Sequence, residues 1–198
     1  MAIQHGIFCL EGDWWNDFNQ TSTVKPVLKL LSQGTQRPVS FVHRDVATRD
    51  EFAHYIAKWS QRGMKKFPLL YLAFHGDPGV LYVGDQRRKE RAVTLDELAE
   101  LLGTGLSGRM VHFGSCSTLN TDRRNITRFL AKTGALAATG FKSDVDWLKS
   151  AAFEVLIFEV MLRFKLTIRG ARQMDKALLE EVPYLRREFK FRMVINES

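Results

Sequence analysis

Short apolar runs alternate with amphipathic segments along most of the chain. Each run is bounded by Gly, Pro or polar residues and is short enough to predict a strand buried on both faces. Between the runs, apolar residues recur at helical spacing. This alternation predicts an α/β fold, specifically a three-layer α/β/α sandwich with a mostly parallel central sheet. The runs that we assign to strands cover residues 7–10, 39–42, 69–74, 110–114 and 135–141.

Helix boundaries follow from capping residues. Capping boxes at Thr48–Glu51 and Thr94–Glu97 each predict the start of a helix. Thr23 is expected to cap an earlier helix that runs to about residue 33, and Gly63 to end the second helix. Further helices are expected at 126–132 and at about 169–181.

The C-terminal third is the most apolar part. A helix from about 146 to 164 is apolar on nearly all sides, so we expect it to be buried, while Lys149 and Glu154 exclude a membrane span. Alternation in 189–195 predicts a final edge strand with one buried face.

Composition narrows the class of protein. The 198 residues suit a single domain, 1–198, and Cys9 and Cys116 are the two cysteines, too few for a disulfide framework or a four-cysteine metal site. We expect a cytoplasmic protein without a signal peptide, a metal or another cofactor. The net charge of +7 comes from scattered basic residues, so we expect neither a nucleic-acid nor a membrane partner.

Two strands end in residues that can do covalent chemistry. The run 69–74 leads into His75-Gly76, and the run 110–114 leads into Ser115-Cys116. Because carboxyl ends of neighbouring parallel strands meet in one crevice, His75 and Cys116 are expected to form a dyad there. All five histidines precede Cys116 in the chain, which excludes α/β-hydrolase and papain-like arrangements around this nucleophile.

This ordered pair resembles the caspase-like (clan CD) cysteine peptidases, which include legumain, clostripain and the metacaspases, and most of all the bacterial CHAT-type branch. The resemblance rests on 69–76, 79–84, 93–102 and 110–118. It implies a hydrolase that cuts a protein or peptide partner, in bacterial regulated proteolysis or antiphage defence. The tandem helical repeats that often precede CHAT domains do not occur in this chain.

The resemblance also implies roles for individual residues. Cys116 would be the nucleophile and His75 its base, with the N–H groups of Gly76 and Cys116 forming the oxyanion hole. Asp77 is close enough in sequence to be considered as a third member. Carboxylates of a pocket selective for Lys or Arg would come from positions near the ends of these elements, namely Glu11, Asp13, Asp144 and Asp146.

Two alternatives stay open. The chain could be a catalytically silent caspase-like module that binds a partner, or a different doubly wound protein that binds a small molecule or nucleotide, although no strand is followed by a Gly-rich phosphate loop. We interpret the remaining chemistry-bearing residues as structural. Those are Cys9, His5, His43, His54, His112, Trp14, Trp15 and Trp59.

Overall fold

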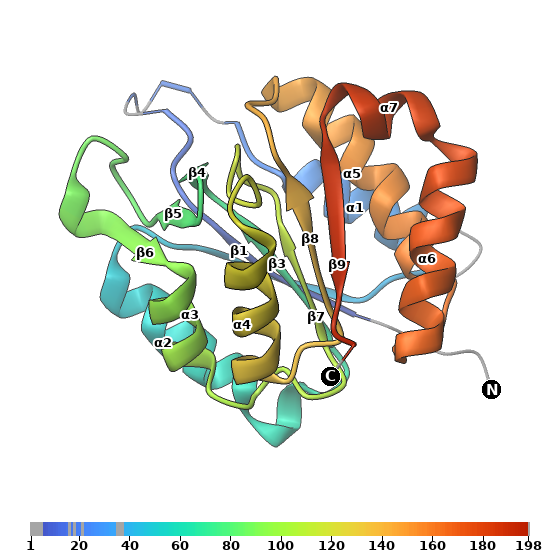
Figure 1. Ribbon diagram of the computed structural model, residues 1–198. Helices are drawn as coiled ribbons and strands as arrows, with labels where there is room; N and C mark the ends of the chain where they lie inside the picture. The colour runs from blue at the N-terminus through green and yellow to red at the C-terminus, as the bar shows by residue number, and fades with distance from the viewer. Residues whose placement is uncertain (1–5, 16, 18, 21, 35–37, 198) are drawn as a thin grey trace.

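The computed structural model describes residues 6–15, 17, 19–20, 22–34 and 38–197 (Figure 1). Its centre is a six-stranded sheet in the order β2-β1-β3-β7-β8-β9. Every neighbouring pair is parallel except β8 and β9, so the expected mostly parallel sheet is confirmed. The strands are β1 (Ile7–Glu11), β2 (Phe41–Asp45), β3 (Leu69–Ala73), β7 (Met110–Phe113), β8 (Ala137–Phe141) and β9 (Phe191–Ile195).

Helices cover both faces of the sheet, which confirms the three-layer sandwich (Figure 1). One face carries α2 (Arg49–Ser60), α3 (Leu95–Leu102) and α4 (Arg123–Thr133). The other face carries α1 (Lys25–Gln33), α5 (Trp147–Met161), α6 (Ile168–Glu181) and α7 (Pro183–Glu188). An apolar core lies between the sheet and the helices on each face. Trp59 is buried in the core under α2, α3 and α4, and Phe158 in the core on the other face.

A small antiparallel sheet lies beside the carboxyl end of β3. It contains β4 (His75–Asp77), β5 (Val80–Tyr82) and β6 (Ala92–Thr94), in that order. The hairpin expected around 79–84 is therefore present. Short 3-10 turns cover Arg62–Met64 and Lys89–Arg91.

Both predicted capping boxes are confirmed, at Thr48 and Thr94. The N-cap of α1 is Val24, one residue after the expected Thr23, but the Thr23 hydroxyl oxygen does accept from Lys25 N–H at 3.2 Å while its proton is donated to the Glu11 carboxylate. Gly63 does not end α2 either: the helix stops at Ser60, and Gly63 lies in the 3-10 turn that follows.

Two expectations about burial are also corrected. Helix α5 is not buried all round, since Leu148 is 70% exposed and Leu156 is 38% exposed on the face turned away from the sheet. Strand β9 is an edge strand as expected, but both of its faces are used: Phe191 packs in one core and Val194 in the other. Among the described residues, no helix is long and apolar enough to cross a membrane.

Candidate active site

His75 stands where the central sheet passes into the small sheet. It follows β3 by one residue, Phe74, and opens β4. Its Nε2 atom lies 2.8 Å from the backbone carbonyl oxygen of Trp14. Because a carbonyl can only accept, Nε2 carries the proton, and Nδ1 is left as the nitrogen that can take a proton from another group. The Trp14 ring meets the imidazole edge-on, with ring centroids 5.6 Å apart.

Cys116 lies in a tight turn after β7. The next residue, Ser117, has a φ of 53°, a left-handed conformation uncommon for residues with a side chain. Side chains brace the turn: the hydroxyls of Ser115 and Thr118 are 2.7 Å apart, and Thr118 Oγ1 donates to the Val80 carbonyl of β5 at 3.1 Å. The turn therefore presents Cys116 at the carboxyl end of the strand next to β3, which is the expected position.

The two strand ends touch through Gly76. A Cβ atom on Gly76 would stand 2.2 Å from Thr118 Oγ1 and 2.9 Å from the Cys116 carbonyl oxygen. The glycine is thus needed for close contact between the His75 and Cys116 segments. The side of Gly76 on which a Cβ would stand faces the protein and not a substrate. Nearby, Gly79 N–H donates to the Thr118 carbonyl at 3.0 Å and adds a second link.

The Cys116 thiol is held by a neighbouring loop. Its Sγ accepts from Val145 N–H at 3.5 Å and donates to the Val145 carbonyl at 3.8 Å. Burial raises the pKa of the Cys116 thiol, and the Val145 N–H opposes that rise. Among the described residues, no hydrogen bond joins Cys116 to His75, and the partner of Sγ in this conformation is Val145.

Two carboxylates influence the Cys116 thiol through their charge. Asp144 accepts from the Ser117 hydroxyl at 2.9 Å, and Asp77 accepts from the Tyr82 hydroxyl at 2.7 Å. After burial, the negative charges of Asp144 and Asp77 also raise the pKa of Cys116. Asp77 therefore acts on the thiol through its charge, while the bond that orients His75 comes from the Trp14 carbonyl.

The other expected pocket carboxylates have structural partners. Asp146 is the N-cap of α5 and accepts from Lys149 N–H at 2.9 Å. Asp13 is exposed and accepts from Trp15 N–H at 3.1 Å within its own loop. The carboxylate of Glu11 is buried and faces β2 and α1. Of the four carboxylates, the structure thus brings only Asp144 into the electrostatic environment of Cys116.

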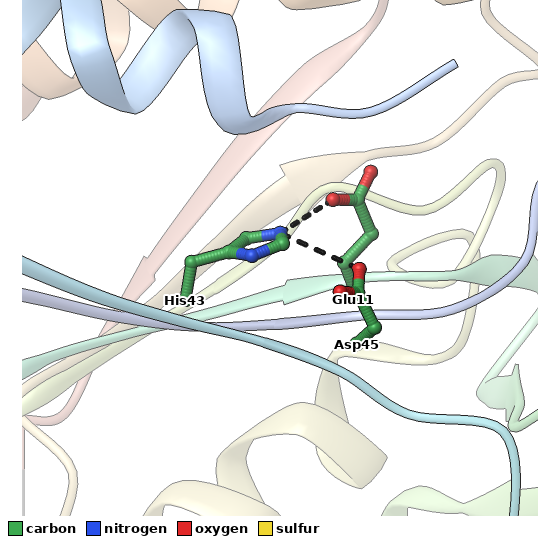
Figure 2. Close-up of side chains that lie close together, drawn as sticks. All are labelled: Glu11, His43 and Asp45. Carbon is green, nitrogen blue, oxygen red and sulfur yellow. Dashed lines mark hydrogen bonds and ion pairs between the residues drawn. The ribbon is translucent and has the colours of Figure 1, made fainter. Parts of the chain in front are cut away.

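One cluster among the described residues has the composition of a metal site. Ligand atoms of Glu11, His43 and Asp45 all lie within 4.8 Å of one another (Figure 2). His43 Nε2 is 2.6 Å from a Glu11 oxygen, a hydrogen-bond distance, and 3.9 Å from Asp45 Oδ1. Both Glu11 oxygens already accept hydrogen bonds from other groups, and Asp45 is 88% exposed. The donor set therefore fits a hydrogen-bonded brace better than a coordination sphere.

A second polar cluster lies inside the core and was missed from the sequence. Glu154 of α5 is 2% exposed, accepts from the Tyr71 hydroxyl, and lies 3.2 Å from His112 Nε2. His112 Nδ1 meets the Thr139 hydroxyl at 2.9 Å. The structural interpretation of His112 is confirmed. Cys9 is also fully buried, as expected, and burial raises the pKa of its thiol.

Sequence reasoning missed Trp14 and Val145 as members of the site. Both contribute through backbone atoms, which every residue carries, so no side-chain motif marks them. Trp59 is a core residue as expected, whereas Trp14 also contacts His75.

Comparison with known proteins places the chain without assigning it an activity. No curated protein matches it. One solved structure, titled "structure of pro-sf-caspase-1", is 13% identical, covering 58% of this chain and 46% of that one, with a TM-score of 0.39. The match thus spans less than half of that chain, and at this TM-score it decides nothing about chemistry. A family model matches residues 4–193, so the chain belongs to the family described as "Family of unknown function (DUF6642)".

Proposed function

We propose that this protein is a cysteine endopeptidase that cuts a protein partner with a His75–Cys116 dyad. The observation that carries the proposal is the packing of Gly76 against the Cys116 turn, where a Cβ atom would overlap Thr118 Oγ1. This contact supports the proposal because it joins the segment that carries His75 to the turn that carries Cys116. The Trp14 carbonyl fixes the histidine tautomer and leaves Nδ1 to act as base.

The reaction follows from these positions. The Cys116 side chain exchanges its bonds to Val145 for one to His75, and Nδ1 takes the thiol proton as Sγ attacks the scissile carbonyl carbon. The N–H groups of Gly76 and Cys116 stabilise the negative oxygen that forms. The C–N bond then breaks, His75 returns the proton to the leaving amine, and water hydrolyses the thioester.

The charge around the sulfur supports a basic residue before the cut. The charges of Asp144, one of the expected pocket carboxylates, and of Asp77 both act on the Cys116 thiol and raise its pKa. Asp13 and Asp146 belong to the same proposal, although each accepts a hydrogen bond from its own loop or helix. On the basis of the CHAT-type resemblance, the proposal includes a cytoplasmic role in bacterial regulated proteolysis or antiphage defence.

Labelling of the thiol tests the dyad directly. Wild type, His75→Ala and Cys116→Ala are treated with iodoacetamide or an acyloxymethyl ketone and read by intact mass. We expect rapid single-site labelling in wild type and a drop of 10- to 100-fold or more in His75→Ala, as expected for loss of a general base. Cys116→Ala measures the background from Cys9, which is fully buried and should label slowly.

The pH dependence separates an assisted thiol from an unassisted one. Burial raises the pKa of Cys116, so in His75→Ala the thiolate fraction, and with it the rate, should keep climbing through alkaline pH. In wild type the rate should level off at lower pH, because His75 accepts the proton. Identical pH profiles in the two proteins would remove His75 from the mechanism.

A silent binding module is the second candidate, and one observation favours it. The thiol is bonded to both backbone groups of Val145 and its pKa is raised, which is the resting state of an unreactive cysteine. Labelling that is slow in wild type and unchanged by His75→Ala would support this candidate.

A further inference from the structure

Glu11 is a buried carboxylate near His75 that the proposed reaction does not use. It is the last residue of β1, level with Ala73 of β3 and two positions short of His75, and only 2% of it is exposed. A buried carboxylate is costly unless donors satisfy it. Glu11 has four such donors, which come from separate parts of the chain.

Three of the bonds tie the carboxylate to β2 and to the start of α1. His43 Nε2 of β2 is 2.6 Å from Oε2, and because a carboxylate only accepts, that nitrogen is the donor. Thr23 Oγ1 donates to Oε2 at 2.6 Å, and Val24 N–H donates to Oε1 at 2.7 Å. Figure 2 shows the His43 ring reaching toward Glu11 from the neighbouring strand. Glu11 is therefore anchored independently of the active site.

The fourth bond leads to the dyad. Trp14 Nε1 donates to Glu11 Oε1 at 2.6 Å, and the carbonyl of the same Trp14 accepts from His75 Nε2 at 2.8 Å. Both ends of Trp14 are thus fixed: its indole by a buried carboxylate, its carbonyl by the imidazole. The ring also lies edge-on against His75.

We propose that Glu11 is a positioning residue for His75, acting through Trp14. This inference rests on the proposed function for its catalytic meaning. With the indole anchored, the Trp14 carbonyl is held where it selects the Nε2–H tautomer, which leaves Nδ1 as the nitrogen that can accept the thiol proton. Small displacements of such a group lower rates far more than they lower stability.

The first test reads the histidine itself and needs no activity. In ¹⁵N-histidine-labelled protein, His75 should show a single Nε2–H tautomer with a slowly exchanging proton, assigned by its loss in His75→Ala. In Trp14→Phe, which keeps the carbonyl and an aromatic ring but lacks Nε1–H, we expect mixed tautomers and faster exchange. Glu11→Leu, which has a similar volume but no acceptor for Trp14 Nε1–H, should give the same change. An unchanged His75 spectrum in both variants overturns the inference, whether or not Cys116 reacts.

A matched control separates positioning from a general loss of stability. Trp59→Phe also deletes one indole hydrogen bond, from Nε1 to the Phe67 carbonyl at 2.8 Å, at the opposite end of β3. It should leave the His75 signal and the Cys116 labelling rate unchanged in folded protein. If Trp59→Phe disturbs His75 as much as Trp14→Phe does, the inference fails.

Labelling kinetics supply the second readout. Trp14→Phe and Glu11→Leu should each slow alkylation of Cys116 by about 10- to 100-fold. Because both act through one bond, the double variant should be no slower than the slower single variant. Additive losses would show that Glu11 does not act through Trp14. A wild type whose labelling ignores His75→Ala would refute the proposed function, while the tautomer measurement would still decide the role of Glu11.

Discussion

Gly76 lies against the Cys116 turn with no room for a side chain. An alanine there would put Cβ 2.2 Å from Thr118 Oγ1 and 2.9 Å from the Cys116 carbonyl. The backbone contact cannot give way without moving the turn. We therefore expect Gly76→Ala to lower the free energy of unfolding by about 1–3 kcal/mol, the usual cost of overpacking, and to slow labelling of Cys116. Urea denaturation and intact-mass labelling measure the two effects.

Gly63 provides the matched control for this substitution. A Cβ atom on Gly63 would meet nothing within 4 Å, so Gly63→Ala should change neither quantity appreciably. If Gly76→Ala were as stable and as reactive as Gly63→Ala, the two strand ends would not depend on close contact at Gly76.

Single residues also show where sequence reasoning succeeds and where it stops. His75 and Cys116 could be assigned to the ends of neighbouring strands because each follows a recognisable apolar run, and parallel strands end at a common edge. Trp14 could not be placed, because its carbonyl and its indole act in two different contacts. Glu11 reads as a surface or pocket carboxylate in the sequence, and its burial depends on donors up to 32 positions away.

At the scale of elements, local sequence signals predict where a helix starts better than they predict which of its faces are buried. The capping boxes at Thr48 and Thr94 need only four consecutive residues, so they could be read directly. The burial of α5 depends on what covers its outer face, which the sequence does not specify, and Leu148 is exposed there. Thr23 accepts from Lys25 N–H at the start of α1, as a capping side chain does, and its bond to the buried Glu11 carboxylate is the part that the local sequence does not reveal.

The capping box of α3 gives a pH-dependent prediction. A hydrogen bond from the Thr94 backbone N–H is the largest cause that lowers the pKa of Glu97 from 4.5 to about 2, and a hydrogen bond from the Arg49 side chain is the second. A carboxyl group whose pKa is lower in the folded state stabilises the fold above pH 4.5, and this contribution is lost as pH falls toward 2. The Glu97 side chain is 42% exposed, so solvent screening limits the effect to about 1 kcal/mol.

Glu97→Gln should therefore be less stable than wild type at neutral pH, with the difference shrinking between pH 4.5 and 2. Chemical denaturation at a series of pH values measures it. Glu100→Gln removes the same charge from an exposed position of α3 and should show a smaller, flatter difference. A constant gap between wild type and Glu97→Gln across this range would contradict the assignment.

At the scale of the whole molecule, the site depends on strand order. The chain places β3 between β1 and β7, so Glu11, His75 and Cys116 come from three adjacent strand ends. The strand pattern of the sequence predicts a mostly parallel sheet, but the order of strands depends on which helices cover which face. Extension of the single domain over 1–198 stays a prediction.

The net charge of the whole protein is opposite in sign to the charge of the carboxylates that act on Cys116. The protein carries a net charge of +7, which should draw anionic reagents to it. Beside Cys116, however, Asp144 and Asp77 are close enough to raise the pKa of the thiol. Exposed charges are screened beyond about 10 Å at 0.1 M salt, so the nearby carboxylates should outweigh the distant cations.

We therefore expect Cys116 to react faster with a methanethiosulfonate that carries a trimethylammonium group than with one that carries a sulfonate. Asp144→Asn should reduce this preference severalfold, and raising the salt concentration should reduce it in wild type. Asp50→Asn makes the same change in net charge at an exposed position of α2 and should leave the preference intact. A faster anionic reagent, or equal effects of the two substitutions, would mean that the overall field governs access to Cys116, and the proposed selection of a Lys or Arg side chain would lose its physical basis.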